Sequence, residues 1–193
     1  MHDIEPFYKW REKYVADQDP DSPFYGREYD EFKFTNKIYN YFVHPQWDDF
    51  GSPTLYGKLI YVDYEEKFAY MELIGEWNDC ITNDIMYLKR EVVDPILQHD
   101  INKFVFFCDN VLNFHGSDDS YYEEWYDDVK ESKGYICFVN TLDHVKIEME
   151  SSRIDHYVKL GYDYNEINWR ALQPKALLNF LEIKMKLETK KLH

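Results

Sequence analysis

The segment from Asp109 to Trp125 holds the side chains of this sequence that could do chemistry. It combines carboxylates, amides, hydroxyls and His115, and residues 104–129 contain seven acidic side chains but no Lys or Arg. Oxygen ligands of this kind suit a divalent cation, and a histidine beside them could support metal-assisted hydrolysis. The carboxylate ligands of such a site would be Asp109, Asp118 and Asp119.

We prefer a structural explanation for most of these acids. Asp118, Asp119 and Ser120 precede a helical pattern, where N-cap residues and first-turn acids stabilise a helix, and Ser120 with Glu123 matches a capping box. Consecutive side chains point in different directions, and Asp109 lies nine positions earlier. The sequence also lacks Walker A, GxGxxG, GxSxG, HExxH and EF-hand motifs. We therefore predict no metal site, no cofactor and no catalytic residue.

The same segment is a candidate surface for a ligand or a partner. In open α/β sheets, ligands bind beyond the carboxyl ends of the strands, where this segment begins. Trp77 follows another predicted strand, so it could form one aromatic, acidic cleft with Asp109, His115 and Tyr121. The predicted surface comprises Trp77, Asp109, Asn110, His115, Ser117, Asp118, Asp119, Tyr121 and Glu124.

Alternating and helical patterns predict the elements that would position these residues. Residues 54–74 show the alternation of a β-hairpin ended by Gly75, and apolar residues at helical spacing between 81 and 96 predict a helix kinked by Pro95. Its N-cap would be Asn78 or Asp79. Buried strands are predicted over 104–108 and 135–139, further helices over 6–16, 120–134, 143–157 and 174–190, and one or two strands within 31–43.

This order of elements favours an α/β fold, with a mixed β-sheet and helices packed on it. We expect a single domain over residues 1–193. Residues 1–53 would add a helix, an acidic loop and strands to a core at 54–160, and residues 161–193 would add an extension and a helix. In the loop at 44–51, Trp47 would fill the core while Asp48 and Asp49 face water.

The stretch from Phe68 to Leu160 resembles a known family. A strand ending in Gly75 and a helix precede a buried strand followed by Asp109-Asn110-Val111, and a helix and a strand ending in Phe138-Val139-Asn140 come next. This order resembles STAS-type domains, the anti-sigma-factor-antagonist fold, and their SpoIIAA-like relatives. The blocks 74–79 and 110–125 are also similar to a family of uncharacterised bacterial proteins.

The resemblance implies binding of other proteins or small ligands without chemistry, and in some relatives a switch by serine phosphorylation near the helix start. Here that zone, 115–120, lacks the family's serine–glycine turn. Four acids also surround Ser120 and would repel a phosphate, so we predict no phosphorylation switch at Ser117 or Ser120.

Composition limits the partners. The formal charge of −15 disfavours nucleic acid and anionic membranes as partners. With no signal peptide, no membrane span and three cysteines outside any CxxC pair, we expect buried reduced thiols in a cytoplasmic protein. The basic C-terminal helix could dock on the chain's own acidic surface or on a second copy in a homodimer.

We therefore expect a non-enzymatic binding or regulatory protein that recognises a protein partner or a small ligand. Two alternatives remain. One is a metal-assisted hydrolase built on the 109–124 loop, and the other is a mimic of nucleic-acid charge.

Overall fold

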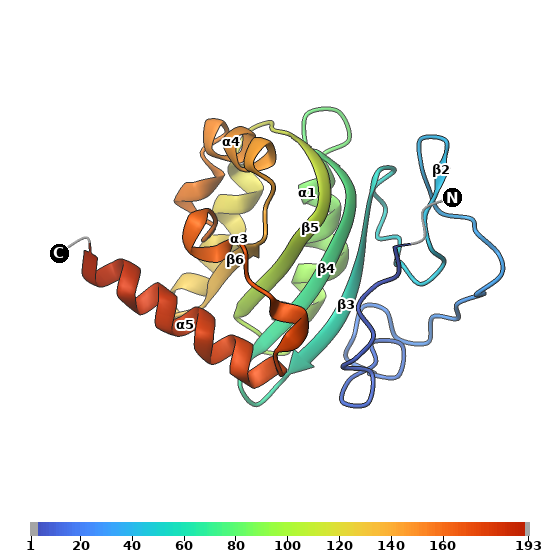
Figure 1. Ribbon diagram of the computed structural model, residues 1–193, viewed down its shortest axis with the longest axis horizontal. Coiled ribbons are helices and arrows are strands. Elements are labelled where there is room, and N and C mark those ends of the chain that lie inside the picture. The colour runs from blue at the N-terminus through green and yellow to red at the C-terminus, as the bar shows by residue number, and fades with distance from the viewer. Residues whose placement is uncertain (1–3, 192–193) are drawn as a thin grey trace.

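A four-stranded mixed sheet forms the centre of the computed structural model, which describes residues 4–191 (Figure 1). Its strands lie in the order β3 (Leu55–Asp63), β4 (Phe68–Asn78), β5 (Lys103–His115) and β6 (Tyr135–Val139). The β3–β4 pair is the predicted antiparallel hairpin, while β5 runs parallel to both β4 and β6. The α/β class and the mixed sheet predicted from the sequence are confirmed.

Helices cover both faces of this sheet, which explains why its strands are continuous apolar runs. Along β5, Phe104 and Phe106 point to one face while Val105 and Phe107 point to the other. The first face is covered by a helical segment at 84–97, by α3 (Ser120–Lys130) and by α4 (Asp143–Ser151). The second is covered by α5 (Pro174–Lys191), by short turns at 162–171 and by Trp10.

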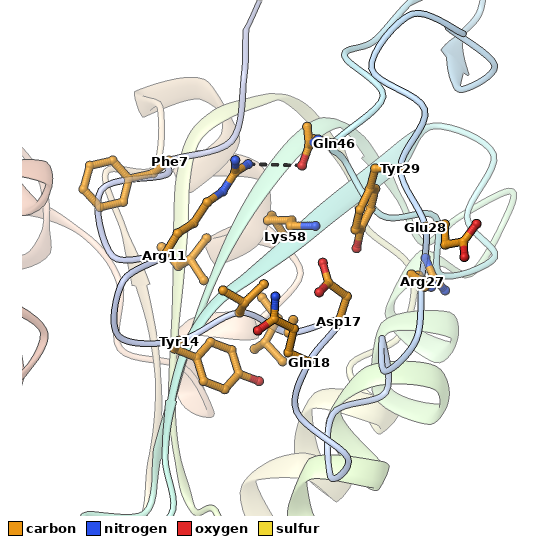
Figure 2. A pocket seen from close by; sticks show the side chains of 14 residues that line it. Phe7, Arg11, Tyr14, Asp17, Gln18, Arg27, Glu28, Tyr29, Gln46 and Lys58 are labelled. Carbon is orange, nitrogen blue, oxygen red and sulfur yellow. Dashed lines mark hydrogen bonds between the residues drawn. The ribbon is translucent and has the colours of Figure 1, made fainter.

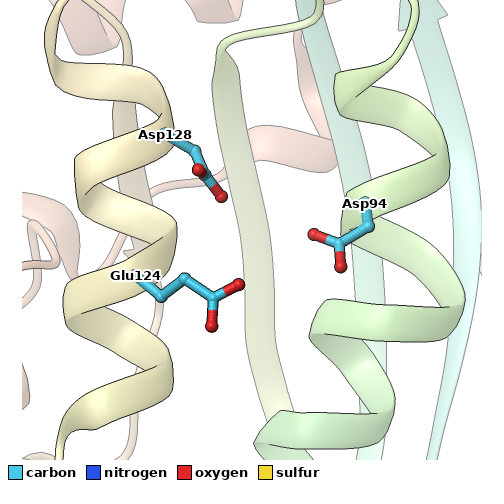
Figure 3. Close-up of side chains that lie close together, drawn as sticks. All are labelled: Asp94, Glu124 and Asp128. Atoms are coloured by element: carbon cyan, nitrogen blue, oxygen red, sulfur yellow. The ribbon is translucent and has the colours of Figure 1, made fainter.

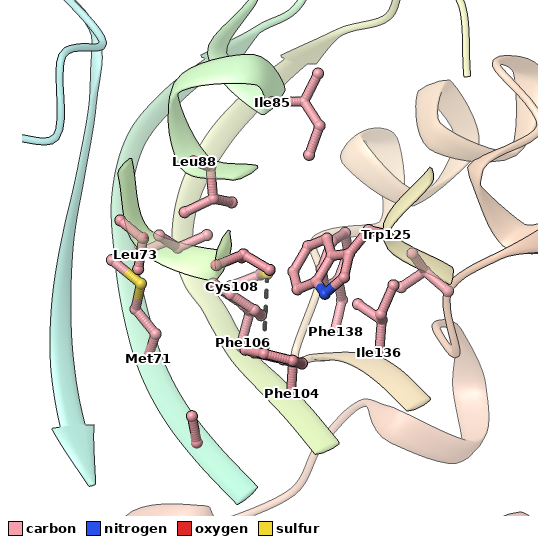
Figure 4. Packing of buried hydrophobic residues seen from close by; sticks show 14 of the residues in the cluster. Met71, Leu73, Ile85, Leu88, Phe104, Phe106, Cys108, Trp125, Ile136 and Phe138 are labelled. Atoms are coloured by element: carbon pink, nitrogen blue, oxygen red, sulfur yellow. Dashed lines mark hydrogen bonds between the residues drawn. The ribbon is translucent and has the colours of Figure 1, made fainter. Parts of the chain in front are cut away.

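Aromatic rings fill the core of the first face (Figure 4). The Trp125 ring lies edge-on to Phe104 and to Phe106, with 5.3 Å between ring centroids in both pairs. Cys108 is buried in this core, whereas Cys137 is buried on the opposite face. Cys80 is exposed, so the prediction that all three thiols are buried is wrong for this one.

Helix α5 docks on its own chain, one of the two arrangements expected from its charge. Leu177, Leu178 and Leu181 are buried against the second face, while Lys103 and Glu182 form an ion pair of 2.9 Å. Its opposite side leaves Phe180 and other apolar side chains exposed. A homodimer through this helix stays a prediction.

The helix predicted over 6–16 is wrong, because this segment forms irregular turns. Trp10 is pulled onto the sheet, where its Nε1–H donates to the carbonyl oxygen of Leu172 at 3.2 Å. The Phe7 amide donates to the buried Glu72 carboxylate at 2.8 Å. These tertiary contacts outweigh the 3–4 spacing of three aromatic residues. The strands predicted in 31–43 shrink to β1 (Lys37–Ile38) and β2 (Tyr41–Phe42).

Three predicted boundaries also move. Strand β4 continues to Asn78, so the next helix begins at Asp84 after the left-handed Asn83, and Ile81 is exposed. That helix consists of α1 (Asp84–Tyr87), a π-helical turn (Leu88–Val93) and α2 (Asp94–Leu97), with the disturbance falling before Pro95. Helix α4 ends at Ser151 because Arg153 adopts a left-handed conformation.

Candidate functional site

Residues 109–115 form the second half of β5, so half of the predicted acidic loop is a strand. Asp109 points to the face covered by α5 and accepts three hydrogen bonds of 3.0–3.1 Å, from Trp169, Arg170 and Asn140. Arg170 also pairs with the buried Glu72, whose pKa is raised by burial. Two acids therefore share one arginine, and Asp109 is engaged in structural contacts.

Trp77 lies on the opposite face of the sheet and is completely buried. Its Nε1–H donates to Asp79 at 2.9 Å, and Asp79 also accepts from the Tyr122 hydroxyl at 2.7 Å and the Ile85 amide at 2.8 Å. Burial raises the pKa of Asp79 to about 6, although these hydrogen bonds oppose the shift. Trp77 and Asp109 therefore do not share the cleft that the sequence suggested.

The start of α3 differs from the predicted capping box. Asp119, not Ser120, is the N-cap residue, and it makes no side-chain capping bond. Ser120 donates its amide and hydroxyl hydrogens to Asp118, and these bonds lower the pKa of that carboxyl. The Asp119 carboxylate instead pairs with Arg153 at 3.2 Å. Because adjacent acids turn to different partners, they do not converge on one point.

Of the other predicted surface residues, Tyr121 and Glu124 share one partner, Arg90. His115 and Ser117 are exposed, Asn110 is partly buried, and Tyr121 lies under the Arg90 guanidinium. Glu124 forms a two-bond ion pair with Arg90 at 2.6 and 2.9 Å. A role of this surface in binding a partner stays a prediction.

One group of three acids does converge in the described part of the chain, and sequence reasoning missed two of its members (Figure 3). Asp94 on α2 faces Glu124 and Asp128 on α3, with carboxylate oxygens within 4.8 Å of one another. The buried Lys89 ammonium lies among them, 2.8 Å from Asp128, 3.4 Å from Glu124 and in contact with Asp94. Burial alone would lower the pKa of Lys89, but its carboxylate partners raise it. A lysine thus occupies the position that a metal ion would need.

The N-terminal pocket is a cavity of about 500 Å³ between residues 7–18 and the outer edge of β3 (Figure 2). Residues 27–29 and Gln46 close its other side. Strand β3 is an edge strand, so its outer side meets this irregular segment instead of another long strand. The pocket is lined by Phe7, Arg11, Tyr14, Val15, Ala16, Asp17, Gln18, Arg27, Glu28, Tyr29, Gln46, Lys58, Leu59 and Ile60.

Lys58 is the charged residue in the wall of the N-terminal pocket that is most deeply buried, with 8% of its surface exposed. Its Nζ lies 3.1 Å from the Asp48 carboxylate and 3.7 Å from the centroid of the Tyr29 ring. Tyr29 donates its hydroxyl hydrogen to Asp48 at 2.5 Å, and Arg27 approaches the same carboxylate at 3.4 Å. Burial lowers the pKa of Lys58 and raises that of Asp48, while their ion pair opposes both shifts.

The prediction that Asp48 faces water is therefore wrong, because this residue is only 1% exposed. The signal for this site was a lysine inside the apolar run Leu55–Val62. A buried ammonium requires a counter-ion, so that lysine implied a buried acid nearby. The sequence alone did not show that Asp48 supplies it.

No family model matches the chain, and no curated protein matches it. Among solved structures, it is similar to a Thermotoga maritima protein described as a "putative anti-sigma factor antagonist", the kind of protein that residues 68–160 resemble. The identity is 18%, the TM-score is 0.41, and the match covers 57% of this chain and 86% of that one.

Within residues 4–191, no helix is both long and apolar enough to cross a membrane.

Proposed function

We propose that this chain is a binding protein without chemistry of its own, and that the N-terminal pocket holds a small ligand. Its volume of about 500 Å³ lies within the range of small-molecule sites, which are roughly 300–1,000 Å³. Such sites combine apolar walls with a few placed polar groups. Here Val15, Leu59 and Ile60 supply apolar surface, and Lys58 and Arg11 supply cations.

The observation that carries the proposal is the Lys58 ammonium. It has three hydrogens to donate, and the described residues give it one carboxylate and one aromatic face. A third hydrogen bond would have to come from water or a ligand in the pocket. Keeping an almost buried cation there costs free energy, which a binding role would account for.

The polar groups that the sequence offered for catalysis are engaged elsewhere. Asp109 serves Trp169 and Arg170, and Asp119 pairs with Arg153. These arrangements disfavour a hydrolase built on the 109–124 loop, because Asp109 and Asp119, two of the three proposed metal ligands, are held by structural partners. The hydrolase alternative loses its proposed ligand set.

A thermal-shift screen of small polar metabolites tests this proposal. A true ligand raises the melting temperature in proportion to the logarithm of its concentration over its dissociation constant. Gln18→Trp would fill the pocket and should abolish the shift, while Gln98→Trp, an exposed position away from the pocket, should preserve it. The proposal fails if no compound stabilises the protein, or if the Gln18→Trp variant responds as the wild type does.

A further inference from the structure

The charges around the N-terminal pocket are balanced, although the chain as a whole carries −15. Arg11, Arg27 and Lys58 supply cations, and Asp17 and Glu28 supply carboxylates in the lining. Asp48 adds a third carboxylate through its ion pair with Lys58. A purely anionic or purely cationic ligand would place its charge beside side chains of the same sign.

Asp17 is the group that selects the ligand class. Its carboxylate makes no hydrogen bond or ion pair with any described residue, and Figure 2 shows it directed into the space below Lys58 and Tyr29. Its charge acts on both neighbours, because it raises the pKa values of Lys58 and Tyr29, although burial has the larger effect on each. A ligand ammonium placed beside Asp17 would give this carboxylate the partner that it lacks.

Arg11 and Lys58 supply the opposite charge on the other side of the pocket. One Arg11 nitrogen donates to the Gln46 side-chain oxygen at 3.1 Å, as drawn in Figure 2, and no other described side chain pairs with this guanidinium. Arg11 therefore keeps N–H donors for a ligand. Lys58 can also donate the third hydrogen of its ammonium group to a ligand. Together they suit a carboxylate.

We propose that the ligand is a zwitterion, namely a free α-amino acid with an apolar side chain. Its ammonium would bind Asp17, its carboxylate would bind Arg11 and Lys58, and its side chain would lie against Val15, Leu59 and Ile60. This inference rests on the proposed function, since it assigns a ligand class to the same pocket.

The test uses titration calorimetry to compare three ligands that share the leucine side chain but carry different charges. Leucine carries both charges, N-acetylleucine keeps only the carboxylate, and leucinamide keeps only the ammonium. Wild-type protein should bind leucine about ten-fold or more tightly than either analogue, because each lost charge removes a charge-assisted hydrogen bond. Alanine, valine, isoleucine, methionine and phenylalanine complete the series.

Two variants locate the contacts. Asp17→Asn should weaken leucine binding about ten-fold or more and leave N-acetylleucine unaffected or bound more tightly. Arg11→Gln should weaken leucine binding and leave leucinamide unaffected. Glu12→Gln and Lys9→Gln are the matched controls, since both remove exposed charges of the same segment that do not line the pocket.

The experiments distinguish failure of the proposed ligand class from failure of the proposed function. If an analogue with one charge binds as tightly as leucine, if Asp17→Asn has no effect on leucine, or if no apolar amino acid binds at millimolar concentration, the ligand class is wrong. Should the metabolite screen still find a ligand that Gln18→Trp excludes, the proposed function stands without this class. When no compound depends on the pocket, both proposals fail.

Discussion

At the scale of single residues, the structure depends on buried charges that have particular partners. Asp79 is held by Trp77, Tyr122 and the Ile85 amide, and Lys58 is held by Asp48. Because each group has few partners, a single substitution should change a measurable property of the protein.

Asp79→Asn should change how stability depends on pH. The folded pKa of about 6 lies above the ordinary value of 3.8, so this group's contribution is complete below pH 3.8 and is lost as pH rises through about 6. The variant has no such titration. Its stability relative to wild type should therefore improve by up to about 3 kcal/mol between about pH 4 and pH 7. Urea unfolding at both pH values measures this difference, and Asp100→Asn, which removes an exposed carboxylate, is the control. If the stability difference between the variant and the wild type were the same at both pH values, Asp79 would have the same pKa in the folded and unfolded states.

At the scale of elements, two cations join α2 to α3: the buried Lys89 and the more exposed Arg90. Lys89 is 1% exposed and contacts Asp94 on α2 and Asp128 on α3. Removing one partner of a buried ion pair typically costs about 3–5 kcal/mol, because the other charge is left without compensation. The acids here are partly exposed, so water would reduce this cost.

Lys89→Ala should therefore lower the free energy of unfolding by about 2–4 kcal/mol and make the protein responsive to calcium. Without the ammonium, the three carboxylates still converge, and Arg90 remains paired with only two of them, Asp94 and Glu124. Millimolar calcium should raise the melting temperature of the variant by several degrees more than that of the wild type. Lys130→Ala, which breaks an exposed pair with Asp127, should do neither. Equal calcium responses in the wild type and the Lys89→Ala variant would contradict the assignment of Lys89 to the position of a metal ion.

Helix α5 allows a comparison of its two sides. Leu181 is buried against the sheet, whereas Leu187 is 52% exposed. Leu181→Ala should lower the free energy of unfolding by about 2–5 kcal/mol, and Leu187→Ala should change it by less than about 1 kcal/mol. Denaturant melts of the two variants measure these values. A large loss of stability for Leu187→Ala would indicate that a second copy covers this side.

The sequence predicted the elements whose signals are local. The β3–β4 hairpin and the strand at 135–139 followed from alternation and short apolar runs, because pairing and burial act directly on these patterns. The helix predicted over residues 6–16 was wrong, because contacts of Trp10 with residues far along the chain decide the conformation of this segment. The N-terminal pocket was missed for the same reason, because residues distant in sequence form its walls.

At the scale of the whole molecule, the charge of −15 acts against the compact state. Ion pairs such as Arg170–Glu72 relieve it locally, but 37 acids face only 22 Lys and Arg residues. Sodium chloride should raise the melting temperature as it screens this repulsion, with most of the gain complete near 0.15 M, where the Debye length is about 8 Å. Melts at constant pH across a salt series measure the gain, and a steady fall with salt would mean that attractive ion pairs outweigh the repulsion.

Because Trp10 contacts Leu172, the N-terminal pocket cannot be completed until late in the synthesis of the chain. The wall of the N-terminal pocket is anchored to residues 172–173, since Lys13 also bonds to Gln173. A ribosome releases residues 7–18 early, but their anchor emerges only after the entire sheet. The nascent chain should therefore acquire its ligand late.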